Sequence, residues 1–283
     1  MEITVVTWNL NNRKNYIEQL DLLMEQVSIE ERDTGTGTDT ERMTVISLQE
    51  IYNKAAFAAF KTSLVSRYRG RNVVGMMADS NRLSCLFVVS ITGAQIRHTG
   101  RRTLMARFKY KNTPITLVSQ HLPAYRFRYA RSIIAKTTVH CSHNALWFGD
   151  LNSRFYCLDR VRTSGGLVTS DTADTSPVSA KRLLSGRHDT HLSKVILRNA
   201  SRVEVNNVLM AEPFRRLEML PGFSEHCINF NPTFPTSPNQ RTPAYPDRVF
   251  HRGERFKCSK YTSLNVSKTA SDHLPVVWIG RFV

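Results

Sequence analysis

Short apolar or alternating runs recur along the chain, and they restrict its fold more than any other feature of the sequence. These runs predict β-strands at Ile3–Trp8, Met43–Leu48, Val73–Met77, Leu83–Val89, Leu104–Tyr110, Ile115–Ser119 and Ala145–Phe148. Helix-like stretches separate some of the strands, and they lie at Tyr16–Val27, Ala55–Val65 and Tyr125–Val139. Other strands follow one another after only a turn, so strict βαβ alternation is absent. The pattern predicts sheets with much antiparallel pairing and helices packed outside them.

Two stretches are typical of exposed loops. Glu30–Arg42 alternates Thr with Gly, and Thr163–Ser179 is rich in Ser, Thr and Gly. Neither is long enough to be a convincing domain linker, and the sequence has no internal repeat. We therefore expect one domain that spans residues 1–283, and we expect it to be a monomer.

The charge balance is the unusual part of the composition. The chain has 39 Lys and Arg against 23 Asp and Glu, which gives a formal net charge of +16. That excess favours a polyanionic partner, either nucleic acid or an acidic membrane surface. The alternative is a basic surface that only promotes solubility and loose binding. Because 41% of residues are hydrophobic, a wholly disordered chain is excluded.

Cysteine usage and the N-terminal residues suggest a compartment. Cys85, Cys141, Cys157, Cys227 and Cys258 are odd in number and lack C-x-x-C or zinc-type spacing. We expect reduced thiols in an intracellular, cytoplasmic protein, with peripheral contact at membranes as a further expectation. Met1–Trp8 resembles a strand, so no secretory signal is apparent, and no run of 18 apolar residues predicts a membrane span.

Polar residues stand where the predicted strands end. The first strand ends in Thr7-Trp8-Asn9, and the second ends in Gln49-Glu50. A carboxylate and an amide oxygen suit a hard cation such as Mg²⁺. Taken singly, Asn9 is more typical of a turn former and Glu50 of a solvated charge than either is of a metal ligand.

Two later strands end in the same way, at Ser119-Gln120-His121 and at Gly149-Asp150-Leu151-Asn152. On an extended backbone Asp150 and Asn152 would share one side, where both could meet one substrate atom. Asp150 could take a proton from water, and Asn152 could hold a phosphate oxygen. The alternative for this segment is an Asx turn after Gly149.

The sharpest signal lies near the C-terminus, where Pro243–Arg248 is followed by Ser271-Asp272-His273. The Asp272 carboxylate could approach a metal while the His273 imidazole faces a phosphate, and Asp247 could fix the imidazole tautomer. A lone Asp-His pair is usually a surface turn. Six such sets in sequence instead predict a metal-dependent phosphoester hydrolase.

The order of these sets resembles the endonuclease/exonuclease/phosphatase superfamily, and the resemblance extends from Thr7 to Val276. Within that superfamily, Trp147–Arg154, Gly222–Glu225 with Ile228–Thr233, and Arg241–Arg248 resemble the inositol polyphosphate 5-phosphatases. The resemblance implies an α+β fold, a DNase I-like four-layer α/β/β/α sandwich of two packed, mostly antiparallel sheets. It also implies Mg²⁺-dependent removal of the 5-phosphate from a phosphoinositide or a soluble inositol polyphosphate.

The resemblance also implies a role for each matching residue. Its metal ligands would be Glu50 with help from Asn9 and Asp272. Its catalytic residues would be Asp150, which activates water, and Asn152, His121, His273 and Asp247. Its substrate-binding residues would be Arg82, Arg241, Arg248, Asn152 and His121. His121 and His273 would stabilise the developing charge, and Asp247 would orient His273.

The chain departs from the family pattern at several positions. Phe234 and Pro235 replace a Tyr and a Lys, which puts recognition of a 4-phosphate in doubt. Leu83-Ser84 replaces two glycines after Asn81-Arg82, and Pro246 replaces a common Cys. Two other hypotheses stay open. The net charge and the shared catalytic sets suggest a nuclease on the same fold with nucleic acid as partner. The departures at Phe234, Pro235 and Leu83-Ser84 suggest a phosphate-binding adaptor with a degenerate site.

The run Tyr125–Arg131 is both aromatic and basic. It could meet a membrane or a nucleic-acid backbone. It could equally be a helix with Arg on its wet face and Tyr and Phe packed inward.

Overall fold

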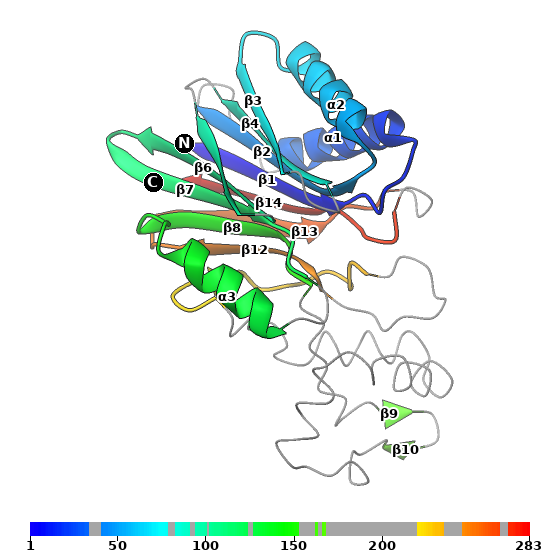
Figure 1. The fold of residues 1–283 in the computed structure, drawn as a ribbon, viewed down its shortest axis with the longest axis vertical. Helices are drawn as coiled ribbons and strands as arrows, with labels where there is room; N and C mark the ends of the chain where they lie inside the picture. The colour runs from blue at the N-terminus through cyan, green and yellow to red at the C-terminus, as the bar shows by residue number, and fades with distance from the viewer. Residues whose placement is uncertain are drawn as a thin grey trace.

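Two six-stranded sheets face each other in the computed structural model (Figure 1). It describes residues 1–33, 41–78, 83–90, 94–100, 102–123, 127–152, 162–163, 166–167, 220–234, 245–266 and 271–283. The first sheet has the order β13 (Phe256–Ser263), β14 (Val276–Phe282), β1 (Glu2–Asn9), β2 (Arg42–Ile51), β4 (Leu83–Ser90) and β3 (Asn72–Ala78). The second has the order β11 (Ser224–Glu225), β12 (Asp247–Arg252), β8 (Asn144–Asp150), β7 (Thr113–Gln120), β6 (Thr103–Tyr110) and β5 (Gln95–Gly100).

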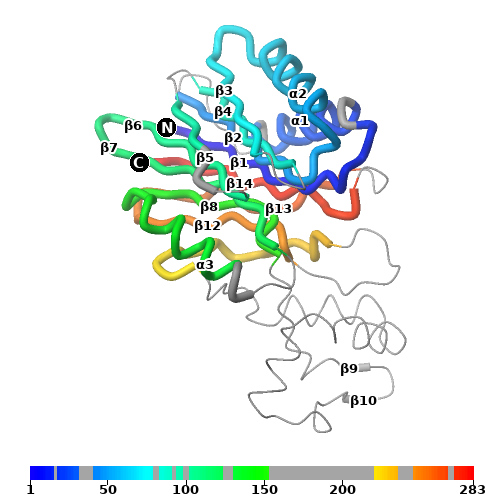
Figure 2. The backbone as a smooth tube through the Cα atoms, in the orientation of Figure 1, coloured from blue at the N-terminus to red at the C-terminus, as the bar shows by residue number. Residues whose placement is uncertain are grey.

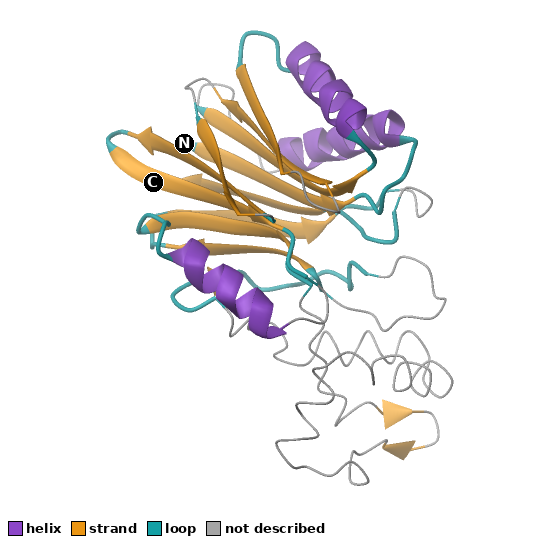
Figure 3. Cartoon of the chain, viewed as in Figure 1, coloured by secondary structure: helices purple, strands orange, loops and turns teal. Residues whose placement is uncertain are grey.

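Helices cover the outer faces of the sheets (Figure 3). The first sheet carries α1 (Tyr16–Asp33) and α2 (Lys54–Arg67), and the second carries α3 (Phe127–Thr138). Among the described strands of the two sheets, β1 with β2 and β7 with β8 pair in parallel, and the other neighbours pair antiparallel. The predicted α/β/β/α sandwich of mostly antiparallel sheets is confirmed.

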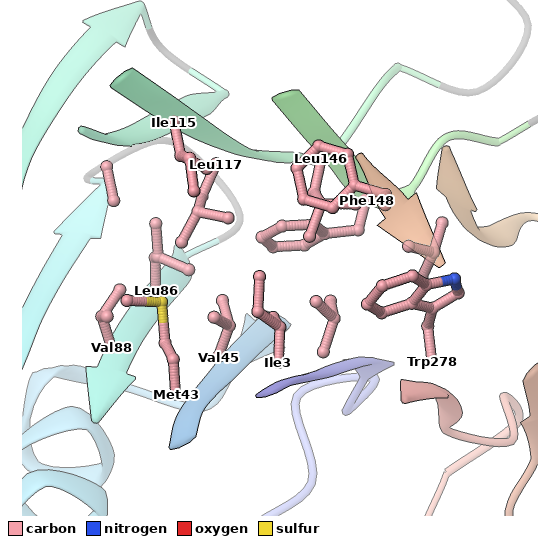
Figure 4. Close-up of a cluster of buried hydrophobic side chains, with 14 of the residues drawn as sticks. Ile3, Met43, Val45, Leu86, Val88, Ile115, Leu117, Leu146, Phe148 and Trp278 are labelled. Atoms are coloured by element: carbon pink, nitrogen blue, oxygen red, sulfur yellow. The ribbon is translucent and has the colours of Figure 1, made fainter. Parts of the chain in front are cut away.

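Strand alternation divides the apolar residues into layers. In β1, Ile3 and Val5 belong to the core between the sheets, whereas Val6 and Trp8 pack with α1 and α2. Figure 4 shows side chains of both sheets meeting in the central core, among them Ile3, Phe148 and Trp278. Burial of each such large side chain contributes about 1.5–3 kcal/mol, so this layer is a main source of stability.

Every predicted strand and helix is present in the structure. The strands that the sequence reading missed are β5, β9 (Arg162–Thr163), β10 (Gly166–Leu167), β11, β12, β13 and β14. Most of them are short or carry charged residues in the strand, as Asp247, Arg248 and Arg252 do in β12, so their periodicity is weak. In contrast, β14 reads VVWIGRF and carried an adequate signal.

The loop prediction for Glu30–Arg42 is too wide at both ends. Helix α1 continues to Asp33 and β2 begins at Arg42, while residues 34–40 lie outside the described ones. The helix extends because Glu31 gains tertiary partners, namely the hydroxyl of Thr4 at 2.7 Å and the guanidinium of Arg42 at 3.3 Å. Most of Thr163–Ser179 also lies outside the described residues, apart from Thr163 and β10 (Gly166–Leu167), which pairs with β9 (Arg162–Thr163).

The run Tyr125–Arg131 enters α3 at Phe127, so the helical interpretation is confirmed for its second part. Residues 124–126, like the side chains of Phe127 to Tyr129, lie outside the described part of the structure. Ala130 is buried against the second sheet and Arg131 is exposed.

Four cysteines in the described part of the chain are free thiols, and Cys157 lies outside it. Of the described helices, none is long and apolar enough to cross a membrane. The two chain ends lie side by side (Figure 2), because the Met1 ammonium donates to the carbonyl of Phe282 at 3.1 Å.

His226 should make folding sensitive to acid. Its ring stacks on His251 with centroids 4.5 Å apart, and burial and the His251 charge lower the pKa of His226 from 6.5 to about 4. At pH values between about 4 and 6.5, His226 is protonated in the unfolded chain and neutral in the folded chain. Stability is therefore present above pH 6.5 and lost as the pH falls through about 4.

Denaturant unfolding at pH 7 and pH 5 tests this expectation. The wild-type protein should lose stability on acidification, and His226→Gln should lose less. The exposed His143, changed to Gln, serves as the matched control and should keep the wild-type loss. An equal loss in all three proteins would show that His226 is not the acid-sensitive group.

Candidate active site

The layer between the two sheets changes from apolar to polar at one end. In β1 the inward series Ile3 and Val5 continues as Thr7 and Asn9. The same change occurs in β2, β7, β8 and β12. The buried polar residues so gathered are Thr7, Asn9, Ser47, Gln49, Ser119, His121, Asp150 and Asp247. The sandwich thus positions a polar cluster where these strands meet.

A hydrogen-bonded floor separates this cluster from the apolar core. The Ser47 and Ser119 hydroxyls are 2.7 Å apart and join the two sheets. The Gln49 amide donates to Ser47 at 2.6 Å and to Thr7 at 3.2 Å. Buried polar groups that are satisfied in this way rigidify their surroundings. The sequence reading missed Ser47 and Ser119, although strand alternation placed both on the inward face.

Glu50 reaches the cluster because the strand is irregular there. Regular alternation would point it toward the helices, as it does Ile46 and Leu48. A register shift between Gln49 and Ile51, together with a φ of 51° at Glu50, turns the side chain inward. A left-handed non-glycine residue is strained, and such strain is common at functional sites.

Asp150 lies at the centre of the cluster. Its Oδ2 accepts from Asn9 Nδ2 at 2.8 Å and lies 3.6 Å from His121 Nε2. The Glu50 Oε1 is also 3.6 Å from His121 Nε2 and accepts from Asn9 at 3.3 Å. Burial alone would raise the pKa of Asp150, but the charges of His273 and His121 and the Asn9 hydrogen bond hold it below its ordinary value. Asp150 is therefore kept as a carboxylate that can accept a proton.

Asn152 forms the Asx turn that was one of the two alternatives from the sequence, and its role in holding phosphate stays a prediction. Its backbone N–H donates to Asp150 Oδ1 at 2.9 Å, which is an Asx-type turn, and its φ is 47°. Its side-chain amide donates to the Leu122 carbonyl at 2.7 Å. Because an amide has two N–H donors, that bond holds Asn152 in place and leaves a donor for a substrate oxygen.

Asp247 and His273 form a buried ion pair beside Asp150. His273 Nδ1 lies 2.8 Å from Asp247 Oδ2, which also accepts from the Thr233 hydroxyl at 2.8 Å. Burial raises the pKa of Asp247. Burial alone would lower the pKa of His273, but the Asp247 carboxylate and its hydrogen bond raise it to about 9. His273 is therefore a cation at neutral pH, with Nδ1 held by Asp247. Thr233 was not predicted as a site residue.

The loop that carries His273 is tied to the end of β1. Trp8 Nε1 donates to the His273 carbonyl at 2.9 Å, and the Ser271 hydroxyl donates to the Asn9 carbonyl at 2.6 Å. The His273 N–H donates to Ser271 Oγ at 3.1 Å. These bonds connect the last motif of the sequence to the first, and they fix the imidazole relative to Asp150.

Arg248 does not lie in the cluster. Its position does not support the predicted role of Arg248 in binding substrate, and that prediction is corrected. It follows Asp247 in β12, so its side chain points to the opposite face. There the buried guanidinium pairs with Glu225, whose Oε1 accepts from Nε at 2.6 Å. Tyr261 donates to the same carboxylate at 2.8 Å. Arg248 thus has a structural partner within the fold.

The other residues named from the sequence lie beside the cluster, outside the described residues, or at the start of β4. Asp272 adjoins the cluster, with Oδ1 4.0 Å from His273 Nε2. Arg82, Arg241, Asn81 and Pro235 lie outside the described residues. Leu83 and Ser84 begin β4, where Ser84 pairs with Gln49 and is buried.

The donor set fits a hard divalent cation. Within the described ranges, no group of three or more His, Cys, Asp or Glu residues forms a closed metal cage. Mg²⁺ needs no such cage, since it is usually held by one or two carboxylates, waters and substrate phosphates. Glu50 and Asp150 supply carboxylates that converge on Asn9. The Asn9 amide presents its nitrogen to them while its oxygen accepts from the Asn11 N–H at 2.9 Å, so ligation by Asn9 requires the amide to turn.

Comparisons with known proteins agree with this geometry. Residues 193–279 match the model of Endonuclease/Exonuclease/phosphatase family 2. One similar structure is the inositol polyphosphate 5-phosphatase domain of spSynaptojanin in complex with inositol (1,4)-bisphosphate and calcium. It is 19% identical with a TM-score of 0.56, over 99% of this chain and 83% of that one.

Two further structures share the fold. TDP2 of D. rerio complexed with a single-strand DNA product is 13% identical with a TM-score of 0.54, over 99% of both chains. A Cimex nitrophorin mutant in its ferrous NO complex is 16% identical with a TM-score of 0.59, over 99% of this chain and 97% of that one. At these identities the likeness shows the fold and not the activity.

The fold is nevertheless clear. The chain has the DNase I-like fold of the endonuclease/exonuclease/phosphatase superfamily, and its motifs resemble those of the inositol polyphosphate 5-phosphatases. The predicted resemblance is confirmed.

Gly149 should be essential for the shape of the strand end before Asp150. Its φ is 137°, and a Cβ placed there would lie 1.9 Å from the Gln120 carbonyl oxygen. Gly149→Ala should lower the free energy of unfolding by about 3 kcal/mol or more, because the clash is with backbone.

Thermal or denaturant unfolding measures the change. Gly70→Ala is the matched control, since Gly70 has a φ of 80° but nothing within 4 Å of the added Cβ. It should cost only about 1 kcal/mol. Equal costs at the two positions would contradict the steric argument.

Proposed function

We propose that the protein is a Mg²⁺-dependent phosphatase that removes the 5-phosphate from phosphoinositides or soluble inositol polyphosphates. The observation that carries the proposal is the Asp150 carboxylate, held with a lowered pKa against Asn9 and beside the His121 and His273 imidazoles. Such a group can accept a proton from water next to cationic groups that stabilise a phosphoryl transition state. The segments Gly222–Glu225 and Arg241–Arg248 favour the inositol branch over the nucleases.

Each residue of the cluster has a role in this reaction. Asp150 takes the proton of the attacking water, and the free N–H of Asn152 holds a phosphate oxygen. His121 and His273 face the charge that develops on the phosphoryl oxygens. Asp247 keeps His273 Nδ1 engaged, which directs Nε2 toward the substrate. Glu50, with Asn9 and Asp272, would hold Mg²⁺, which supplies Lewis-acid chemistry when bound.

The substrate preference follows in part from Phe234. Its side chain is 1% exposed, and its ring packs against the His273 ring at an interplanar angle of 45°, with centroids 4.6 Å apart. Phe234 supports the imidazole and has no hydroxyl to offer a neighbouring ring phosphate. We propose that a 4-phosphate contributes little to recognition. With a lipid substrate, the net charge of +16 would favour contact with an acidic membrane surface.

Asp150→Asn should lower phosphate release by roughly 100- to 1,000-fold, because an amide cannot accept the proton. A malachite-green assay on a panel of inositol lipids and soluble inositol phosphates with Mg²⁺ measures it. Asp21→Asn, an exposed acid on α1, is the matched control and should keep wild-type activity. The proposal fails if the wild-type protein releases no phosphate from any 5-phosphorylated member.

The second candidate function is a nuclease, favoured by the net charge and by the TDP2 structure with its DNA product. Nicking of plasmid DNA that disappears in Asp150→Asn would establish it over the phosphatase. Tight binding of inositol lipids without turnover by the wild-type protein would instead favour a phosphate-binding adaptor.

Glu50→Gln should raise the Mg²⁺ concentration needed for half-maximal activity by at least about tenfold, because a neutral amide replaces the main ligand. Activity measured across a Mg²⁺ titration tests this. Glu18→Gln changes an exposed acid in the first turn of α1 and should leave the titration unchanged. An unshifted titration for Glu50→Gln would remove Glu50 from the metal site.

A further inference from the structure

We propose that a basic hollow on the outer face of β6 and β7 is a second ligand site, which binds a phosphorylated anion. The hollow has a volume of ≈ 560 Å³, and its polar lining includes Gln95, Arg107, Lys109, Thr116, His140 and Ser142. Ligand pockets for small molecules commonly have volumes of this order. The inference does not depend on the proposed phosphatase activity.

Strand register builds the base of the hollow. Arg107 in β6 pairs with Gln95 in β5 on one side and with Thr116 in β7 on the other, so the three form a row across the sheet. The residues on either side of Arg107 in sequence, Ala106 and Phe108, are packed in the core between the sheets. Arg107 and Lys109 therefore point outward, and both are exposed.

The turn after α3 forms the wall. Ser142 N donates to Thr116 Oγ1 at 3.0 Å, and the hydroxyls of these two residues are 2.9 Å apart, which anchors the turn to β7. Carbonyl oxygens in this turn would repel an anion. Each of these oxygens instead accepts a hydrogen bond from a guanidinium group. Arg107 donates to the His140 carbonyl, and Arg252 donates to the carbonyls of Cys141 and Ser142.

The charge of the hollow selects an anion. Among the described residues, its lining contains Arg107 and Lys109 and no Asp or Glu. A guanidinium has five N–H donors, so the bond to His140 leaves Arg107 able to bind an anion as well. Arginine and lysine together with hydroxyl and amide groups are the usual partners of phosphate. A phosphate group is therefore the ligand chemistry that fits.

This site is separate from the candidate active site. Thr116 and His121 are roughly 17 Å apart along the chain direction of β7, and the hollow opens on the outer face whereas His121 faces the other sheet. The turn between β6 and β7 lies near both termini (Figure 2), and Arg255 donates to the Thr113 hydroxyl there at 2.7 Å. One small ligand cannot occupy both sites.

Calorimetric titration of the full chain with tripolyphosphate, in EDTA to exclude metal-dependent binding, tests the proposal. Lys109→Gln should weaken binding by about tenfold, as expected for the loss of one charge-assisted hydrogen bond. Arg107→Gln should weaken it at least as much, and Arg107→Lys should restore part of the loss. Lys61→Gln removes an exposed lysine from α2 and is the matched control, with affinity unchanged.

A sedimentation experiment with lipid vesicles tests whether the phosphate group belongs to a lipid headgroup or to a soluble ligand. Vesicles that contain phosphatidylinositol 4-phosphate should sediment the wild-type protein and not Lys109→Gln if the ligand is a lipid headgroup. Binding of tripolyphosphate alone, sensitive to Lys109, would support a soluble ligand. The proposal is overturned if no phosphate probe binds, or if Lys109→Gln and Lys61→Gln weaken binding equally, which would indicate a diffuse basic surface.

Discussion

The hydrogen bond from Asn9 to Asp150 is the contact on which the candidate site depends. It joins the end of β1 in one sheet to the end of β8 in the other, at 2.8 Å, and it stabilises a carboxylate that burial alone would neutralise. The bond is possible only because the two sheets pack at a fixed distance through their apolar core. Core packing thus sets the geometry of a polar site at its edge.

The site balances buried charges of both signs. Glu50, Asp150 and Asp247 carry negative charge, and His273 carries positive charge at neutral pH. An isolated buried charge would be unstable, so each of these groups has at least one hydrogen-bond or ionic partner. A bound divalent cation would add two positive charges to this arrangement, and a phosphate group would add about two negative ones. Asp150 and His273 are held in fixed positions by these partners.

Sequence reasoning predicted where the strands end more reliably than it predicted the directions of the side chains there. Alternation placed Asn9 and Asp150 correctly, because both belong to regular strands. It could not place Glu50, whose direction depends on a register shift between β2 and β4. It also could not foresee that Arg248, next to Asp247, would bind Glu225 on β11 and point away from the polar cluster. That contact joins two side chains 23 positions apart, and it forms only because β11 pairs with β12.

The sequence by itself determined most of the strands, the three long helices and the set of chemically competent residues, because periodicity and residue type are local properties. The two-sheet sandwich was what the resemblance to the superfamily implied. It also determined the basic net charge. Only the tertiary structure decided which residues meet: the floor of Ser47 and Ser119, the protonated His273 beside Asp247, and the hollow around Arg107. Those features arise from contacts between strands far apart in the chain, whose spacing and register are fixed only when both sheets pack together.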